Sequence, residues 1–167
     1  MAAPCFIAHS AATSALTAPM SGVATSTTSG TVKTILQIAP LKKIRITEWG
    51  YLFAAAPTSP VQVELIETGT IFATVTTIGS ITNYNDTTGP ASQATAGTAA
   101  TGFNASAEGT ITATRLLAQT YDLSTYFKQQ FPLGREPEVN AGYSLRIRAT
   151  PSTSAATTVL AYCIWEE

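Results

Sequence analysis

Apolar and polar residues alternate along several short segments of the chain, and a period of two is typical of strands that bury one face. The most regular segment is 61–67. Its apolar residues are expected on the inward face, namely Val61, Val63 and Leu65. Its polar residues Gln62 and Glu64 are expected on the outward face. Residues 142–150 repeat the pattern with apolar residues inward and arginines outward: Leu145, Ile147 and Ala149, then Arg146 and Arg148. We expect both segments to be core strands, with the arginines on a solvated or inter-subunit face.

The alternation changes phase within residues 43–53. The apolar pattern passes from one set of positions to another: Ile44 and Ile46 first, then Trp49, Tyr51 and Phe53. One extra residue in a strand moves the following side chains to the opposite face. The change of phase therefore predicts a β-bulge near Gly50.

Further segments rich in β-branched or apolar residues complete the set of expected strands: 31–40, 70–78, 109–119 and 157–165. We expect residues 61–67 and 70–78 to form a hairpin. Residues 157–165 are apolar on both faces, which favours a central strand or one covered by a partner. Residues 121–131 are ambiguous, because they contain residues that could cap a short helix.

Two low-complexity blocks interrupt this pattern. Residues 1–30 are rich in Ala, Ser and Thr, and no Asp, Glu, Lys or Arg occurs between Ala8 and Gly30. Such a segment buries too little apolar surface to fold alone, so we expect an extended N-terminal arm. The arm could reach a neighbouring copy or wrap onto its own domain. Residues 79–107 predict a long inserted loop, since they exceed the usual length of a connection.

These elements predict an all-β protein with one antiparallel β-sandwich domain at residues 31–167. About eight strands separated by long connectors favour a jelly-roll-like arrangement. An immunoglobulin-like sandwich is the alternative, although the Cys–Trp–Cys spacing of that fold is missing.

The composition points to a surface with few charges. Charged residues make up 11% of the 167 residues, against roughly 25% in typical soluble domains. The surface must therefore consist largely of Thr, Ser, Asn, Gln and small residues, as in a secreted protein or one covered by other subunits. A formal net charge of −1 gives no electrostatic footprint for nucleic acid or an anionic membrane. No apolar stretch reaches the ~20 residues that span a bilayer.

The two cysteines lie at opposite ends of the chain. They could pair only if the N-terminus folds back onto the last strand. We expect Cys163 instead to be free and buried, because it falls within an apolar run. The N-terminus lacks a basic region and is interrupted by Pro4 and His9, which makes it a poor secretory signal. These features favour a soluble protein made in a cytoplasm.

Candidate chemistry is sparse. His9 is the single histidine, so a catalytic triad would have to be built in the arm, beside Cys5 or Ser10. One histidine and two distant cysteines do not provide an ordinary zinc site. Two pairs of carboxylates could serve as a glycosidase pair: Glu64 with Glu67 and Glu136 with Glu138. Outward strand positions and a solvated connector explain them more simply. We therefore expect no enzyme and no catalytic, cofactor-binding or metal-binding residue.

The aromatic residues of the phase-changing segment allow two interpretations. Trp49, Tyr51 and Phe53 could stack on sugar rings, as aromatic side chains do in lectins, or they could pack in the core beside the bulge. Core packing is the simpler expectation, because their alternation already matches a buried strand face.

Four segments in this order carry a family resemblance: IRITEWGYLF, PVQVELIET, FPLGREPEV and AGYSLRIRAT. Over residues 31–165 the chain resembles the head decoration, or cement, proteins of tailed bacteriophages, which have a jelly-roll-like fold. The resemblance implies a virion structural protein on the capsid surface, assembled in the host cytoplasm. It also implies that a homotrimer binds the major capsid protein of the assembled shell and stabilises it without catalysis. The alternative is a receptor- or glycan-binding tail or spike module.

Overall fold

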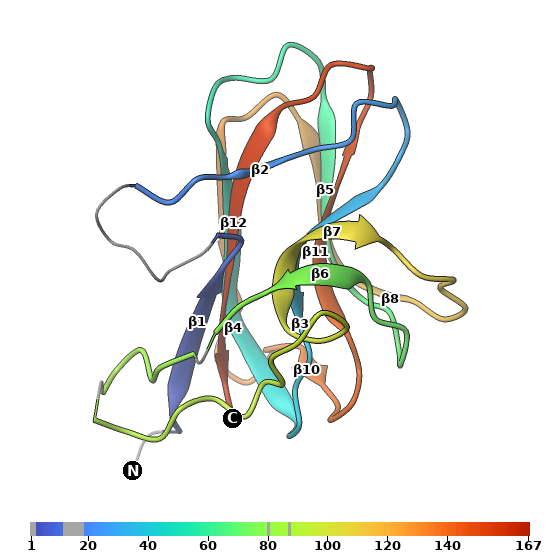
Figure 1. Cartoon of the computed structure of the whole chain (residues 1–167). Coiled ribbons are helices and arrows are strands. Elements are labelled where there is room, and N and C mark those ends of the chain that lie inside the picture. The colour runs from blue at the N-terminus through green and yellow to red at the C-terminus, as the bar shows by residue number, and fades with distance from the viewer. Residues whose placement is uncertain (1–2, 12–18, 80, 87) are drawn as a thin grey trace.

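The computed structural model describes residues 3–11, 19–79, 81–86 and 88–167 (Figure 1). The described part of the chain contains strands and no helix. Twelve strands form two antiparallel six-stranded sheets that pack face to face as an open sandwich. This confirms the all-β sandwich, although the expected count of about eight strands is too low.

Sheet A has β12 at its centre. Its strands are β1 (Cys5–His9), β2 (Val23–Ala24), β4 (Ile44–Phe53), β9 (Tyr126–Gln130), β10 (Glu138–Val139) and β12 (Thr158–Glu166). β12 pairs with β1 and β2 on one side and with β4 on the other, and β4 also pairs with β9 and β10. The central position of β12 agrees with its apolar residues on both faces.

Sheet B is a continuous ladder of six strands. Its order is β6 (Thr74–Thr77), β7 (Gly102–Ala107), β3 (Lys33–Ile38), β11 (Leu145–Pro151), β5 (Val61–Glu67) and β8 (Arg115–Asp122). The expected hairpin between residues 61–67 and 70–78 is wrong, because β5 pairs with β11 and β8 while β6 pairs with β7.

The core lies between the sheets and contains the inward side chains of both. The largest fully buried apolar side chains include Trp49, Trp165, Tyr51, Phe6, Ile35, Leu36, Ile38, Ile44, Ile46, Leu65 and Leu145. Leu145, Ile147 and Ala149 are buried as predicted. Tyr51 stacks on Phe127 with ring centroids 5.5 Å apart. The aromatic residues of β4 are therefore core residues, not sugar platforms.

The phase change in β4 is real, but its position differs from the prediction. Ile164 pairs with Glu48 and Trp165 with Ile46, so Thr47 is the extra residue. The bulge lies at Thr47, three positions before Gly50. Both Ile46 and Trp49 point into the core as a result, with no exposed surface remaining on either.

Two further expectations are corrected by long-range pairing. The inserted segment 79–107 is not a loop throughout, because its last six residues form β7 between β3 and β6. The ambiguous segment 121–131 holds strand β9 instead of a helix, because it extends sheet A along β4.

The described part of the predicted arm belongs to sheet A of its own chain. β1 runs antiparallel to β12 from Cys5, opposite Glu166, to His9, opposite Tyr162. β2 adds a two-residue ladder further along β12. Residues 1–2 and 12–18 of the arm lie outside the described residues. The sequence left two arrangements open for the arm, contact with a neighbouring copy or with its own domain. The described part of the arm has the second arrangement.

Arg146 is not solvated, contrary to the expectation for the outward face of β11. Its side chain has no exposed surface, because Glu108 and the carbonyl of Ile71 cover it. Arg148 is 12% exposed and pairs with Glu64, with Nη2 2.5 Å from Oε1. The outer face of sheet B thus holds ion pairs that are largely shielded from solvent.

Candidate interaction face

The outer face of sheet A is built on the outward positions of β12. Four residues of this strand alternate with fully buried ones and remain partly exposed: Leu160, Tyr162, Ile164 and Glu166. Because β12 is central, its outward side chains form the middle of a face that extends onto β1, β4 and β9. We call the outward residues of these four strands face A.

Apolar side chains occupy two zones of face A. On one side, Ile7 and Ile164 pair across β1 and β12, and the row continues to the polar side chains of Glu48 on β4 and Gln130 on β9. On the other side, Leu160, Leu52 and Tyr126 form a row across β12, β4 and β9. Leu52 is 47% exposed and Tyr126 is 57% exposed. Large apolar surface is therefore presented to solvent by the central strand β4 and by the edge strand β9 beside it.

A polar row separates the two apolar zones. His9, Tyr162, Gly50 and Lys128 are consecutive partners across β1, β12, β4 and β9. The Tyr162 hydroxyl donates to Glu48 Oε1 at 2.6 Å, and Lys128 Nζ lies 3.1 Å from Glu48 Oε2. Glu48 thus neutralises Lys128 and holds the tyrosine ring in place.

Gly50 is required by the position of the Tyr162 ring. A Cβ atom at this residue would lie 2.8 Å from Tyr162 Cε1 and 2.5 Å from the carbonyl oxygen of Phe127. Real Cβ atoms essentially never approach other atoms so closely. Glycine therefore lets the Tyr162 ring lie across β4.

The ionisable groups of the polar row carry no net charge near neutral pH. Burial, followed by the hydrogen bond to Glu48, raises the pKa of the Tyr162 hydroxyl. The hydrogen bond to Glu48 also raises the pKa of Lys128, and burial lowers the pKa of His9. Tyr162 and His9 are neutral as a result, and the charges of Lys128 and Glu48 cancel.

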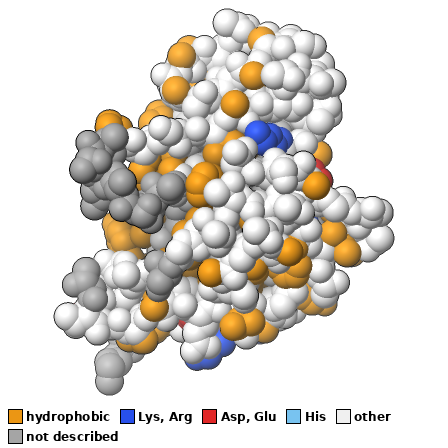
Figure 2. Space-filling model, viewed as in Figure 1, with side chains coloured by type: hydrophobic (Ala, Val, Ile, Leu, Met, Phe, Trp, Pro, Cys, Tyr) orange, Lys and Arg blue, Asp and Glu red, His pale blue; other side chains and the backbone are white. Residues whose placement is uncertain are grey.

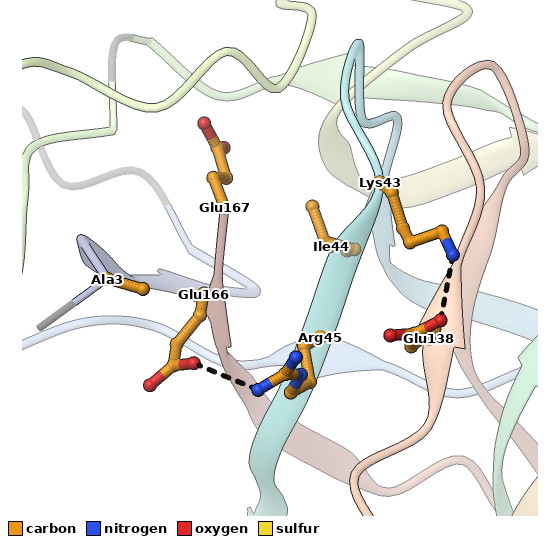
Figure 3. A pocket seen from close by; sticks show the side chains of 7 residues that line it. All are labelled: Ala3, Lys43, Ile44, Arg45, Glu138, Glu166 and Glu167. Atoms are coloured by element: carbon orange, nitrogen blue, oxygen red, sulfur yellow. Dashed lines mark hydrogen bonds and ion pairs between the residues drawn. The ribbon is translucent and has the colours of Figure 1, made fainter.

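A charged depression borders face A where β4 begins and β12 ends (Figure 3). Its volume is about 160 Å³, and its lining residues are Ala3, Lys43, Ile44, Arg45, Glu138, Glu166 and Glu167. Lys43 Nζ lies 2.9 Å from Glu138 Oε2, and Arg45 Nη1 lies 3.9 Å from Glu166 Oε2. The hydrogen bond from Lys43 lowers the pKa of Glu138. These paired charges give face A a polar border.

The groups considered for nucleophilic catalysis are kept apart. Cys5 and His9 both point outward on β1, but four residues of strand separate them by about 13 Å. Burial, and then Glu166, raise the pKa of the Cys5 thiol, which disfavours its thiolate. Ser10 is buried, and its hydroxyl accepts the Ala161 N–H at 2.8 Å. The arm therefore brings neither nucleophile to the imidazole.

The carboxylates considered as a glycosidase pair are used in ion pairs. Glu64 binds Arg148, and Glu67 Oε2 lies 2.5 Å from Arg115 Nη2. Glu138 binds Lys43 at the border of face A. Cys163 is free and buried, as predicted, and burial raises its pKa.

No group of three or more His, Cys, Asp and Glu side chains could hold a metal ion in residues 3–11, 19–79, 81–86 and 88–167. In the same part of the chain, no helix is long and apolar enough to cross a membrane.

Comparisons of the chain with models of protein families, with curated proteins and with solved structures gave no match. The interpretation of face A therefore depends on its own residues. Figure 2 shows a view of the molecule on which few charged side chains are visible and hydrophobic ones are scattered, consistent with the 11% of charged residues.

Sequence reasoning identified no residue of face A as functional. A signal was present in residues 157–165, whose outward positions Leu160, Tyr162 and Ile164 are apolar or aromatic. The contributions of β1 and β9 could not be found in this way, because they reach the face through pairing over long distances in sequence.

Proposed function

We propose that the chain is a non-catalytic structural subunit of a virion that binds an assembled protein shell through face A. The observation that carries this proposal is the exposed apolar surface of Leu52 on the central strand β4 and of Tyr126 on the neighbouring edge strand β9. Tyrosine is enriched in protein interfaces, and charged groups are depleted from their cores. Tyr126 and Tyr162 of face A match this enrichment, and the charges of Glu48 and Lys128 beside them are paired with each other.

The partner in this proposal is the major capsid protein, and the location is the outer surface of the capsid. A subunit that binds only the assembled shell stabilises it by mass action. Many copies on one shell allow each contact to be weak. Capsid decoration agrees with the sparse charge of the chain, since much of its surface would face other subunits.

We extend the proposal to a jelly-roll-like subtype of the sandwich. The chain passes from sheet B to sheet A and back in β3, β4 and β5, and it crosses again between β8 and β9. Repeated crossing between two sheets is a feature of jelly rolls, in which Greek-key connections link the layers.

The test uses substitutions that alter face A and leave the core untouched. Leu52→Asp and Tyr126→Ala change outward side chains, so we expect both variants to fold with nearly unchanged melting temperatures. Each should weaken binding to purified shells about fivefold or more in a co-sedimentation assay, as expected for central interface residues. Thr76→Asp, at an exposed position of β6 on sheet B, is the matched control. Undiminished binding by both face A variants would contradict the proposal.

The second candidate is a receptor- or glycan-binding module of a tail or spike. Trp49 and Tyr51 cannot serve it because both are buried, but Tyr84 and Tyr126 are 58% and 57% exposed. Their rings could stack on sugars. Binding to a glycan array that disappears in both Tyr84→Ala and Tyr126→Ala would favour this candidate over shell binding.

A further inference from the structure

Strand β8 is an open edge of sheet B. It is eight residues long and pairs with β5 alone among the described strands. Natural edge strands are usually protected by charged residues (above all lysine), by proline, by a β-bulge or by a short length. In β8 the charged residues are confined to the two ends, Arg115 and Asp122, and the single bulge at Leu117 is followed by five residues of regular strand. β8 contains neither lysine nor proline, whereas β6 at the opposite edge has only four residues. β8 can therefore accept another strand along its free side.

A bulge in β8 determines which side chains face outward. Leu65 pairs with Ala118 and Ile66 with Leu116, so Leu117 is an extra residue. The outward side chains are consequently Leu116, Gln119 and Tyr121. Leu116 is 52% exposed and Tyr121 is 59% exposed.

The inward side chains of β8 carry opposite charges at the two ends of the strand. Arg115 begins the strand and binds Glu67 and the carbonyl of Glu138, and its side chain is 50% exposed. Asp122 ends the strand and accepts the Ser124 N–H at 3.0 Å. The strand therefore has a half-exposed cationic side chain at its start, already paired with Glu67, and an anionic side chain at its end.

We propose that β8 pairs antiparallel with β8 of a second copy of this chain, around a two-fold axis between their Gln119 residues. This pairing places Tyr121 opposite Leu116 of the second copy, with both side chains on the outer face. The charged ends meet as Asp122 and Arg115 of the second copy. Thr120 lies opposite Leu117 and Ala118 of the second copy, so each bulge is accommodated.

Charge complementarity argues for this partner and this direction. In the antiparallel arrangement each end of the joined strands pairs Arg115 with Asp122, and symmetry repeats the pair. In a parallel arrangement, arginine would face arginine, and like charges directly opposite each other are destabilising. The two six-stranded sheets would join into one sheet of twelve strands.

The dimer should be of modest affinity. Eight paired residues bury less surface than the roughly 1,600 Å² of a standard stable interface. Sedimentation equilibrium of the full chain from about 1 µM to about 1 mM should therefore show a monomer–dimer equilibrium. The inference is independent of shell binding, because no shell enters the measurement.

Gln119 provides the decisive substitution, because the symmetry axis brings it opposite itself. Gln119→Lys and Gln119→Glu each place two like charges together, and each should raise the dimer dissociation constant about fivefold. An equimolar mixture of the two variants should restore the dimer as a mixed species. Thr76→Lys on β6 should leave the equilibrium unchanged.

A cross-link tests the register directly. The Cα atoms of opposite residues in antiparallel strands lie about 4.5–5.5 Å apart, a separation that a disulfide can bridge. Gln119→Cys combined with Cys5→Ser should form a disulfide-linked dimer under mild oxidation, and Thr76→Cys with Cys5→Ser should not. A monomer or a trimer at every concentration, no recovery in the mixture, or no cross-link at residue 119 would each overturn the proposal.

Discussion

The ion pair between Arg146 and Glu108 supports a quantitative prediction about stability. The fully buried Arg146 guanidinium donates from Nη1 to Glu108 Oε2 at 3.1 Å and to the Glu108 carbonyl at 3.0 Å. It also donates to the Ile71 carbonyl at 2.5 Å. Glu108 accepts the Thr34 N–H at 2.5 Å in addition. One carboxylate thus neutralises a buried cation and completes the hydrogen bonding of β3.

Glu108→Gln keeps the size of this side chain but removes its charge. Removing one partner of a buried ion pair costs about 3–5 kcal/mol. The Glu108 side chain is 22% exposed, so water partly screens the pair, and we expect a loss of about 2–3 kcal/mol. In an Arg146→Met background, the same substitution should cost less than about 1 kcal/mol, because no buried charge remains unpaired.

Urea unfolding followed by tryptophan fluorescence measures these losses, since Trp49 and Trp165 are both fully buried. Glu138→Gln is the matched control, because its ion pair with Lys43 lies on the surface, and it should leave the midpoint unchanged. If Glu108→Gln costs less than about 0.5 kcal/mol, or costs equally with and without Arg146, the ion pair does not have the stabilising role assigned to it.

Two further outcomes are expected. Gly50→Ala should lower the free energy of unfolding, measured by thermal unfolding, by about 1–3 kcal/mol, because the added Cβ meets the Phe127 carbonyl and the Tyr162 ring. Gly79→Ala should be nearly neutral, because Gly79 has open space around it. Equal effects of the two substitutions would argue against the clash. Burial holds the pKa of His9 below its unfolded value of about 6.5, so the unfolded chain binds a proton more readily and stability should fall as the pH drops through about 6.5. Melting temperatures between about pH 7.5 and 5 should therefore decline more steeply for the native chain than for His9→Gln, and parallel declines would refute the contribution of His9.

The strands whose burial depends on local alternation were predictable from the sequence. The inward residues of β5 and β11 follow directly from a period of two, and the phase change in β4 correctly indicated a bulge. Its location at Thr47 could not be read from β4 alone, because the register with β12 determines it. The same limitation explains the wrong hairpin, since alternation does not specify the partner of a strand.

The environment of the outward residues was much less predictable. Arg146 has the pattern of a solvated residue, yet Glu108 and Ile71 cover it from segments 38 and 75 positions away in the sequence. Face A likewise combines side chains from four strands that the sequence separates widely. Only β12 carried a local signal, in the apolar residues on its outward face.

The central position of β12 also has a consequence for the order of folding. The pairing of Cys5 with Glu166 joins residues at nearly opposite ends of the chain, and contacts of such sequence separation form slowly. While the chain is being synthesised, β1 and β4 have no strand between them, and the edges that pair with β12 stay open until β12 emerges. Sheet A can therefore close only after translation of β12, and until then the open edges of β1 and β4 are exposed to pairing with other chains.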